Sequence, residues 1–174
     1  MLTDIALFIL RVTIGLLFAA HGAQKLFGWF DGTGFRNHMG MMEKMGFHPS
    51  WFWALVNALA EFGGGLLMVL GVLSAIAAAA IISSMLMAII KVHAPNGFFN
   101  KDRGYEFPLT LLVAALTIGL AGPGALALNP LIFESWPRLT VFAISLLIGL
   151  IGVGAGLLVS QRERQLRGGQ PKTT

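Results

Sequence analysis

The stretch LTVFAISLLIGLIGVGAGLLV, residues 139–159, contains no ionisable side chain. About 20 mostly apolar residues are enough for a helix to cross a bilayer. Four further apolar stretches of similar length precede it, at residues 5–27, 52–72, 74–92 and 107–126. Only 11% of the residues are charged and 56% are hydrophobic, whereas a soluble domain carries about 25% charged residues. The sequence therefore predicts an all-α, polytopic membrane helical bundle with five spans.

We expect residues 1–160 to form a single transmembrane domain and residues 161–174 to form a basic, disordered tail. The chain has no cysteine, which excludes thiolate metal sites, iron–sulfur clusters and dithiol chemistry. Its net charge is +4. In a membrane protein such an excess of Lys and Arg encodes topology and contact with anionic lipid, so we expect lipid rather than nucleic acid as a partner.

Lys and Arg are distributed unevenly between the two ends of the predicted spans. One end, with the N-terminus and the 127–138 connection, carries Arg138 alone, and Arg11 lies within a span. The opposite end carries the other basic residues: Lys25, Arg36, Lys44, Lys91, Lys101, Arg103, Arg162, Arg164, Arg167 and Lys172. Positively charged loops stay in the cytoplasm. We therefore expect a multi-pass protein of the bacterial cytoplasmic (inner) membrane, with its N-terminus outside and its C-terminus in the cytoplasm.

The segment between the first two spans, residues 28–50, is too polar to cross the membrane. Phe35, Met39 and Met42 recur at helical spacing in it and form an apolar stripe. This pattern predicts a short interfacial helix on the cytoplasmic face. The segment also contains His38 and several methionines, which together fit a copper(I) site. Methionine more commonly fills irregular apolar surfaces, and we expect no metal site.

Gly149, Gly152 and Gly156 form a face of small residues on the last predicted span. Small residues allow helices to approach closely in lipid. Two interpretations stay open for this face. It either packs within the bundle or forms the seam of a homo-oligomer or of a contact with a partner subunit.

Four ionisable residues lie within the predicted spans: Arg11, His21, Lys25 and Glu61. The first three share an arc of about 80° on one helix, and we expect this arc to face the bundle interior. His21 and Glu61 fall about 9 and 13 Å from the cytoplasmic end, so we expect them to be neighbours. Arg11 is the expected deeper charge partner of Glu61. Ionisable groups in a bilayer are costly, so each is a functional hypothesis.

Further polar residues follow the third span and return to the same level. We expect one pocket near the cytoplasmic leaflet, lined by His21, Lys25, Glu61, Lys91, His93 and Tyr105. In this hypothesis Glu61, His21 and Tyr105 exchange protons, and the ligand is bound by Arg11, Lys25, Lys91, His93, Asn96 and Glu106. The structural alternative is that Glu61 pairs with Arg11 or Lys25 to lock the bundle while the lysines extend toward the membrane surface.

These residues belong to several separated motifs: Arg11-x-x-x-Gly15, Ala20-His21-Gly22-x-x-Lys25-Leu26-Phe27-Gly28, Glu61-x-Gly63-Gly64, Val92-His93-x-x-Asn96-Gly97-Phe98-Phe99, Gly104-Tyr105-Glu106-Phe107 and Gly122-Pro123-Gly124. Over about residues 5–130 the chain strongly resembles the DoxX family of small bacterial membrane proteins. The resemblance implies a four-helix core, with the fifth span and the tail as an extension. It also implies redox chemistry, because the family is related to the DoxD subunit of thiosulfate:quinone oxidoreductase and its members are described as oxidoreductases or membrane parts of oxidoreductase complexes.

Three functions fit these observations. The first is the membrane subunit of an oxidoreductase system, with a polar pocket for a quinone or similar small ligand and a soluble redox partner that supplies electrons. The second is a non-catalytic scaffolding subunit of a larger respiratory or other redox membrane complex. The third is a haem protein with His21 and His93 as axial ligands, although their estimated depths do not match. We expect no covalently bound cofactor.

Overall fold

The computed structural model describes residues 1–128 and 137–168. This part of the chain contains no β-strand, which confirms the all-α class. Its helices are α1 (Leu2–Phe27), α2 (Gly34–Lys44), α3 (Ser50–Leu70), α4 (Ser74–Ala88), α5 (Glu106–Ala121) and α6 (Arg138–Gly168). Three short helical turns, η1 (Ile89–His93), η2 (Ala94–Asn96) and η3 (Asn100–Asp102), connect α4 to α5.

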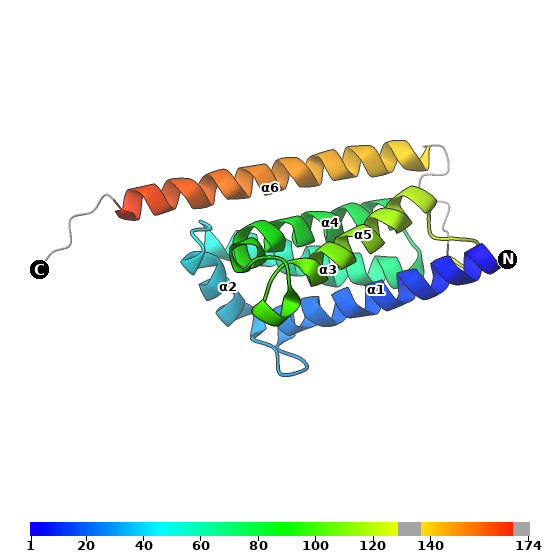
Figure 1. Cartoon of the computed structure of the whole chain (residues 1–174), viewed down its shortest axis with the longest axis horizontal. Coiled ribbons are helices and arrows are strands. Elements are labelled where there is room, and N and C mark those ends of the chain that lie inside the picture. Colours follow the sequence, from blue (N-terminus) through cyan, green and yellow to red (C-terminus); the bar gives the residue numbers. More distant parts are fainter. Residues whose placement is uncertain (129–136, 169–174) are drawn as a thin grey trace, which may run out of the picture.

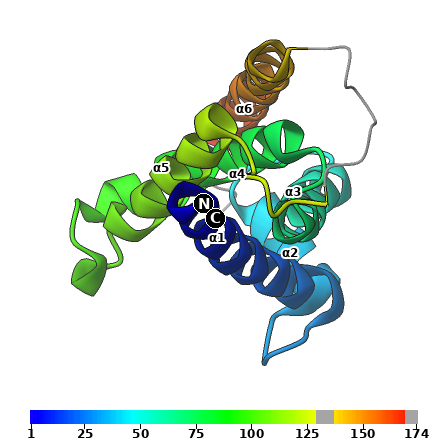
Figure 2. The same ribbon diagram turned by 90° about the vertical axis from the view of Figure 1, so that its right-hand side faces the viewer.

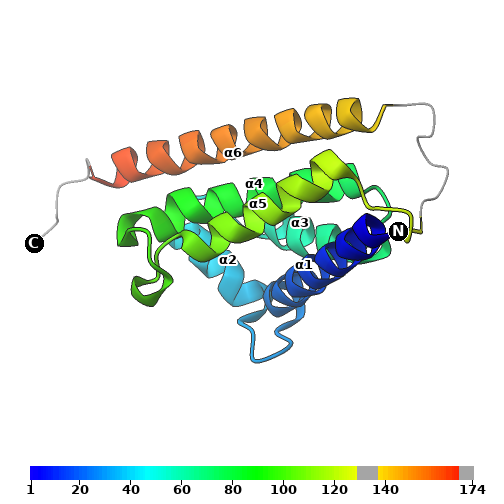
Figure 3. The same cartoon turned by 45° about the vertical axis from the view of Figure 1, so that its right-hand side comes forward.

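Four helical segments of the described chain are long and apolar enough to cross a membrane: α1, α3, α6 and the continuous segment Ser74–Asn96. The fourth predicted span, residues 107–126, differs, because α5 ends at Ala121. Its 16 residues extend about 24 Å, less than the hydrocarbon thickness of about 30 Å. Gly122, at φ 90°, ends the helix, and Pro123 follows it. α5 nevertheless runs beside α4 (Figure 3).

The last helix is longer than the sequence predicted. The predicted span 139–159 lies within α6, but α6 continues without a break to Gly168. Residues 161–168 are therefore helical rather than part of a disordered tail, because Gln161, Arg162 and the residues after them are good helix formers until Gly168. Residues 169–174 lie outside the described residues. At 31 residues, α6 is about 46 Å long and extends beyond the hydrocarbon core.

The helices form a bundle with α4 near its centre (Figure 2). α3, α5 and α6 each pack against α4, and α1 lies mainly against α3. The N-terminus and the C-terminal end of α6 lie at opposite ends of the bundle (Figure 1). The predicted interfacial helix is present as α2, which packs against α3 and α1.

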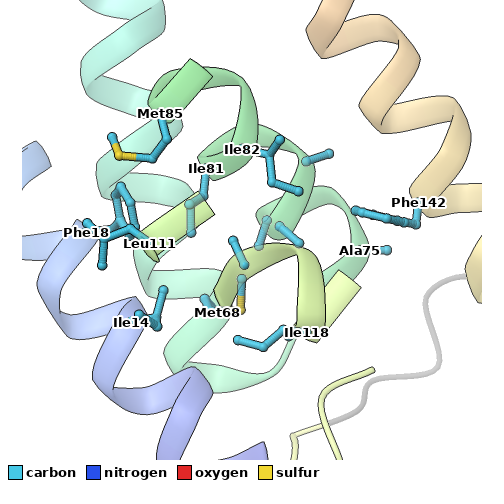
Figure 4. Packing of buried hydrophobic residues seen from close by; sticks show 14 residues of the cluster. Ile14, Phe18, Met68, Ala75, Ile81, Ile82, Met85, Leu111, Ile118 and Phe142 are labelled. Carbon is cyan, nitrogen blue, oxygen red and sulfur yellow. The ribbon is translucent and has the colours of Figure 1, made fainter. Parts of the chain in front are cut away.

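The apolar core joins side chains from all five long helices (Figure 4). Phe18 of α1, Met68 of α3, Ile81 of α4, Ile118 of α5 and Phe142 of α6 are all buried in it. Ala77, Ala78 and Ala79 of α4 are at most 2% exposed, and their small side chains allow neighbouring helices to approach closely. A second buried cluster joins Met42, Phe47 and Ala54. Met39 and Met45 pack against this cluster, whereas Met41 is 48% exposed.

Two of the three glycines of the α6 face pack within the chain. A Cβ on Gly149 would collide with Ser83 of α4, and one on Gly156 would meet Met87, Trp53 and Phe47. At Gly152, in contrast, a Cβ would meet nothing within 4 Å. The sequence left two interpretations open for this face. For Gly149 and Gly156 the structure shows packing within the bundle.

Candidate functional site

A buried ion pair joins α1 to α3. Lys25 Nζ lies 2.5 Å from Glu61 Oε1, and the side chains are 25% and 3% exposed. Both residues were expected at one site, and of the two partners proposed for Glu61 the structure selects Lys25. Glu61 Oε2 is also buried and has no hydrogen-bond partner.

Asn57 and Ser84 complete a ring of hydrogen bonds around this pair. Lys25 Nζ donates to Asn57 Oδ1 at 2.8 Å, and Asn57 Nδ2 donates to Ser84 Oγ at 2.9 Å. Ser84 Oγ in turn donates to Glu61 Oε1 at 2.7 Å. The ring thus joins α1, α3 and α4, and two of its four hydrogen bonds end on the same carboxylate oxygen.

His38 of the interfacial helix α2 adjoins this ring. Its side chain is 3% exposed, and its Nε2 has no hydrogen-bond partner. The pKa of His38 is lowered to about 4, mainly by burial and also by the Lys25 charge, whereas the Glu61 charge and the Asn57 side chain oppose this shift. The imidazole is therefore neutral at pH 7, beside the only buried ion pair of the described residues.

A cavity of about 570 Å³ adjoins the ring on the side of α4 and α6. Most of its lining is apolar and comes from α3, α4 and α6, and Met42 of α2 and Phe47 also line it. Four polar residues line it: Asn57, Ser83, Ser84 and Ser145. Asn57 and Ser84 also belong to the ring, so the ion pair lies directly behind a polar part of the cavity wall.

Arg11 does not pair with Glu61, which corrects the expected charge pair. Its guanidinium donates to the backbone oxygens of Val69, at the end of α3, and of Leu126, in the segment after α5. The side chain is 1% exposed. Carbonyl groups at the end of a helix have no intrahelical partner and attract a cation. Arg11 therefore caps α3 and fixes the segment after α5, a structural role away from the ring.

His21 does not face the bundle interior as expected. It is exposed on α1, and its Nδ1 lies 2.8 Å from Leu17 O of the same helix. The adjacent Gly22 takes the inward position instead, where a Cβ would overlap the backbone of Phe62. The inward face of α1 is thus set by glycine packing, about 100° away from His21.

Lys91 does not belong to the hydrogen-bonded ring around Lys25 and Glu61. Its Nζ donates to Ser160 Oγ at 2.5 Å and lies 5.4 Å from the centre of the Phe47 ring. Ser160 is fully buried and donates to Met45 O at 2.5 Å. Lys91 therefore links α6 to the connection between α2 and α3.

The other polar residues expected at the site build the connection between α4 and α5. His93 Nδ1 lies 2.9 Å from Arg103 O, to which Asn96 Nδ2 also donates at 3.3 Å. The Tyr105 ring packs edge-on against Phe98, and Glu106 begins α5. These groups bond within their own segment, so the structure divides the expected pocket into this connection, the Lys91 contact and the ring.

Asn57, Ser84 and His38 were not predicted as members of the site, although the sequence contains signals for two of them. Asn57 precedes Glu61 by four residues and so lies on the same face of α3. His38 falls on the stripe of Phe35, Met39 and Met42, which marks it as buried. Ser84 gave no comparable signal, because serine is common in closely packed membrane helices.

Comparison with known proteins agrees with this architecture. The DoxX family profile matches residues 6–94. The chain is 30% identical to "Putative oxidoreductase CatD" of Bacillus subtilis (strain 168) over 131 residues, 75% of this chain and 90% of that protein. It is 27% identical to "Inner membrane protein YqjF" of Escherichia coli (strain K12) over 135 residues, 78% of this chain and 98% of that protein.

A third relative is "Uncharacterized membrane protein Rv3486" of Mycobacterium tuberculosis, 28% identical over 130 residues, 69% of this chain and 77% of that protein. No solved structure matches the chain. The region that the family profile matches covers most of α1 and all of α2, α3 and α4, and with them the whole ring around Glu61. The profile match over half of the chain, together with the identity to the Bacillus protein, shows that this membrane protein belongs to the DoxX family.

Proposed function

We propose that the protein is the membrane subunit of an oxidoreductase system and that the cavity beside the ring binds a quinone or a similar small amphipathic ligand. The observation that carries this proposal is the contact between an apolar cavity and a buried ion pair. The wall of a mostly apolar cavity includes Asn57 and Ser84, and both are hydrogen-bonded into the buried Lys25–Glu61 pair.

The cavity suits a ligand that arrives from the membrane. Its volume falls within the range of about 300–1,000 Å³ usual for small-molecule sites. α3 and α6 both pack against α4 but make few contacts with each other. Val56 of α3 and Ile148 of α6, which line the cavity, are 45% and 64% exposed. An apolar ligand can therefore enter sideways between these two helices.

The ring supplies groups for proton exchange with a bound headgroup. Ser84 lies between the cavity and Glu61, so a proton that leaves or reaches the ligand has a hydrogen-bonded route to a carboxylate. Electrons come from a soluble redox partner in this proposal. The name of the Bacillus relative supports an oxidoreductase role.

We further propose the bacterial inner membrane as the location, with the N-terminus outside and the C-terminal end of α6 in the cytoplasm. The name of the Escherichia coli relative supports this membrane. The ends of the bundle differ in charge, because α2 and the C-terminal end of α6 lie opposite the N-terminus (Figure 1). Arg162 and Arg164 belong to that end of α6. Positively charged segments are retained in the cytoplasm.

A pair of glycine variants tests the cavity directly. Gly152→Leu places a side chain into the cavity, whereas Gly154→Leu adds the same side chain on α6 at a position that does not line it; a Cβ meets nothing within 4 Å at either glycine. The proteins are purified in mild detergent, and quinones are measured in organic extracts. We expect quinone with the wild type and Gly154→Leu and its loss from Gly152→Leu. Equal quinone in all three, or none in any, would contradict the proposal, and a large complex that co-purifies equally with all three would favour the scaffolding function.

A further inference from the structure

The directions of the hydrogen bonds in the ring follow from the chemistry of its members. The Lys25 ammonium group can only donate, so the atom of Asn57 that faces it is Oδ1, and Nδ2 faces Ser84. The amide nitrogen of Asn57 also only donates, so Ser84 Oγ is the acceptor in that bond. The single hydroxyl proton of Ser84 is therefore directed at Glu61 Oε1.

Ser83, which lines the same cavity, also uses its hydroxyl proton in a hydrogen bond within the protein. Its hydroxyl donates to Ala79 O of its own helix at 2.8 Å. Each serine oxygen has two lone pairs and one proton. Both hydroxyl groups that α4 contributes to the cavity thus have their protons in use and offer lone pairs to a ligand.

We infer that the cavity selects a ligand that donates hydrogen bonds, namely the hydroxyl-bearing form of an amphipathic aromatic, such as a hydroquinone, over the corresponding quinone. This inference rests on the proposed function and specifies its ligand. A quinone oxygen only accepts, so it can use the second N–H of Asn57 but leaves the free lone pairs of Ser83 and Ser84 without a donor. A hydroquinone hydroxyl accepts the same N–H and also donates to Ser84 Oγ, so it makes one hydrogen bond more. A buried polar group left without a partner costs more than a hydrogen bond gains.

The test compares three probes of nearly the same shape: a decyl-substituted benzohydroquinone, its quinone, and the dimethyl ether of the hydroquinone. Binding to the full chain in detergent is measured by calorimetry without oxygen, with a reductant added only to the hydroquinone titration so that the quinone probe stays oxidised. We expect the hydroquinone to bind about tenfold more tightly than the other two, equivalent to about 1.4 kcal/mol. The ether has no proton to donate, so weak binding of the ether identifies donation as the cause.

Variants locate the preference within the cavity. Ser84→Ala removes an acceptor and should reduce the ratio of hydroquinone to quinone affinity to about one. If Ser84→Ala does not fold, Ser83→Ala takes its place and should reduce this ratio in part. Thr110→Ala, which removes an exposed hydroxyl of α5 that does not line the cavity, should keep the tenfold ratio. Equal or tighter binding of the quinone or the ether to the wild type overturns the inference.

The outcomes separate this inference from the proposed function. Tight binding of the quinone that disappears in Gly152→Leu retains the cavity as the site and overturns only the preference. Absence of binding by all three probes overturns both.

Discussion

Glu61 of α3 accepts hydrogen bonds from both Lys25 and Ser84 on one oxygen, Oε1, while its other oxygen is buried without a partner. The carboxylate is therefore held from two helices and keeps one free acceptor atom. A carboxylate that served only to lock the bundle would gain by using both of its oxygens. The same residue thus connects the stability of the bundle to the chemistry that we propose for the cavity.

The Lys25–Glu61 pair should stabilise the fold, because removal of one partner leaves a poorly solvated charge. We expect Glu61→Gln to lower the free energy of unfolding by about 2 kcal/mol, less than a fully buried pair would give because Lys25 is partly exposed. Lys25→Met combined with Glu61→Gln should recover part of this loss. The measurement is a double-mutant cycle of unfolding in detergent. Strictly additive effects of the two changes would show that the pair contributes nothing.

His38 should make stability depend on pH. Its imidazole has a pKa of about 4 in the folded protein, against about 6.5 in the unfolded chain. Because the unfolded state binds the proton more readily, protonation of His38 favours unfolding. The free energy of unfolding is therefore highest above pH 6.5 and falls by up to about 3 kcal/mol as the pH falls toward 4. Thermal unfolding from pH 7.5 to 4.5 should show this loss in the wild type and a smaller loss in His38→Gln. His21→Gln, at an exposed position, is the control, and an unchanged slope in His38→Gln would contradict the burial of His38.

Arg11 should be required for the fold rather than for ligand binding. Arg11→Lys keeps the charge but loses the planar guanidinium group, whose two terminal nitrogens bond to Val69 O and Leu126 O. We expect a loss of about 2 kcal/mol of unfolding free energy and faster proteolysis between α5 and α6. Ligand affinity of the folded fraction should not change. A change in affinity at wild-type stability would assign Arg11 to the site instead.

The close contact of α1 with α3 predicts different effects for two neighbouring glycines. A Cβ on Gly65 would overlap the backbone of Ala19, whereas one on Gly63 would meet nothing within 4 Å. Gly65→Leu should prevent stable folding, and Gly63→Leu should be tolerated because the side chain extends outward. Expression and size-exclusion profiles in detergent distinguish the two. Similar profiles for both variants would show that the helices are farther apart than described.

Much of the fold followed from the sequence, because hydrophobic length and helical periodicity reflect requirements of the bilayer itself. Four of the five predicted spans correspond to long apolar helices of the described chain. α5 was predicted too long, since apolar residues continue to Leu126 although Gly122 and Pro123 end the helix. The helical end of α6 was missed because its charge was interpreted as a sign of disorder.

The site was predicted only in part, for a physical reason. Depth along each helix can be estimated from residue counts, and this placed His21 at nearly the level of Glu61, with Lys25 on the same arc of the helix. The direction in which a side chain points depends on how helices rotate against one another, and close glycine contacts such as that of Gly22 with Phe62 determine this rotation. His21 and Arg11 were assigned to the interior site from depth and arc alone. The structure places one on the surface and the other at the end of α3.

Photolabelling tests the central claim, the ligand cavity between α3, α4 and α6, most directly. The protein is irradiated in lipid nanodiscs with a photoreactive quinone analogue, and the labelled peptides are identified by mass spectrometry. The structure predicts adducts on residues 53–60, 76–87 and 145–153, which contain most of the cavity lining, and their loss when excess unlabelled quinone is added. Labelling confined to residues 93–106 or to His21, or labelling that excess quinone does not reduce, would contradict the account.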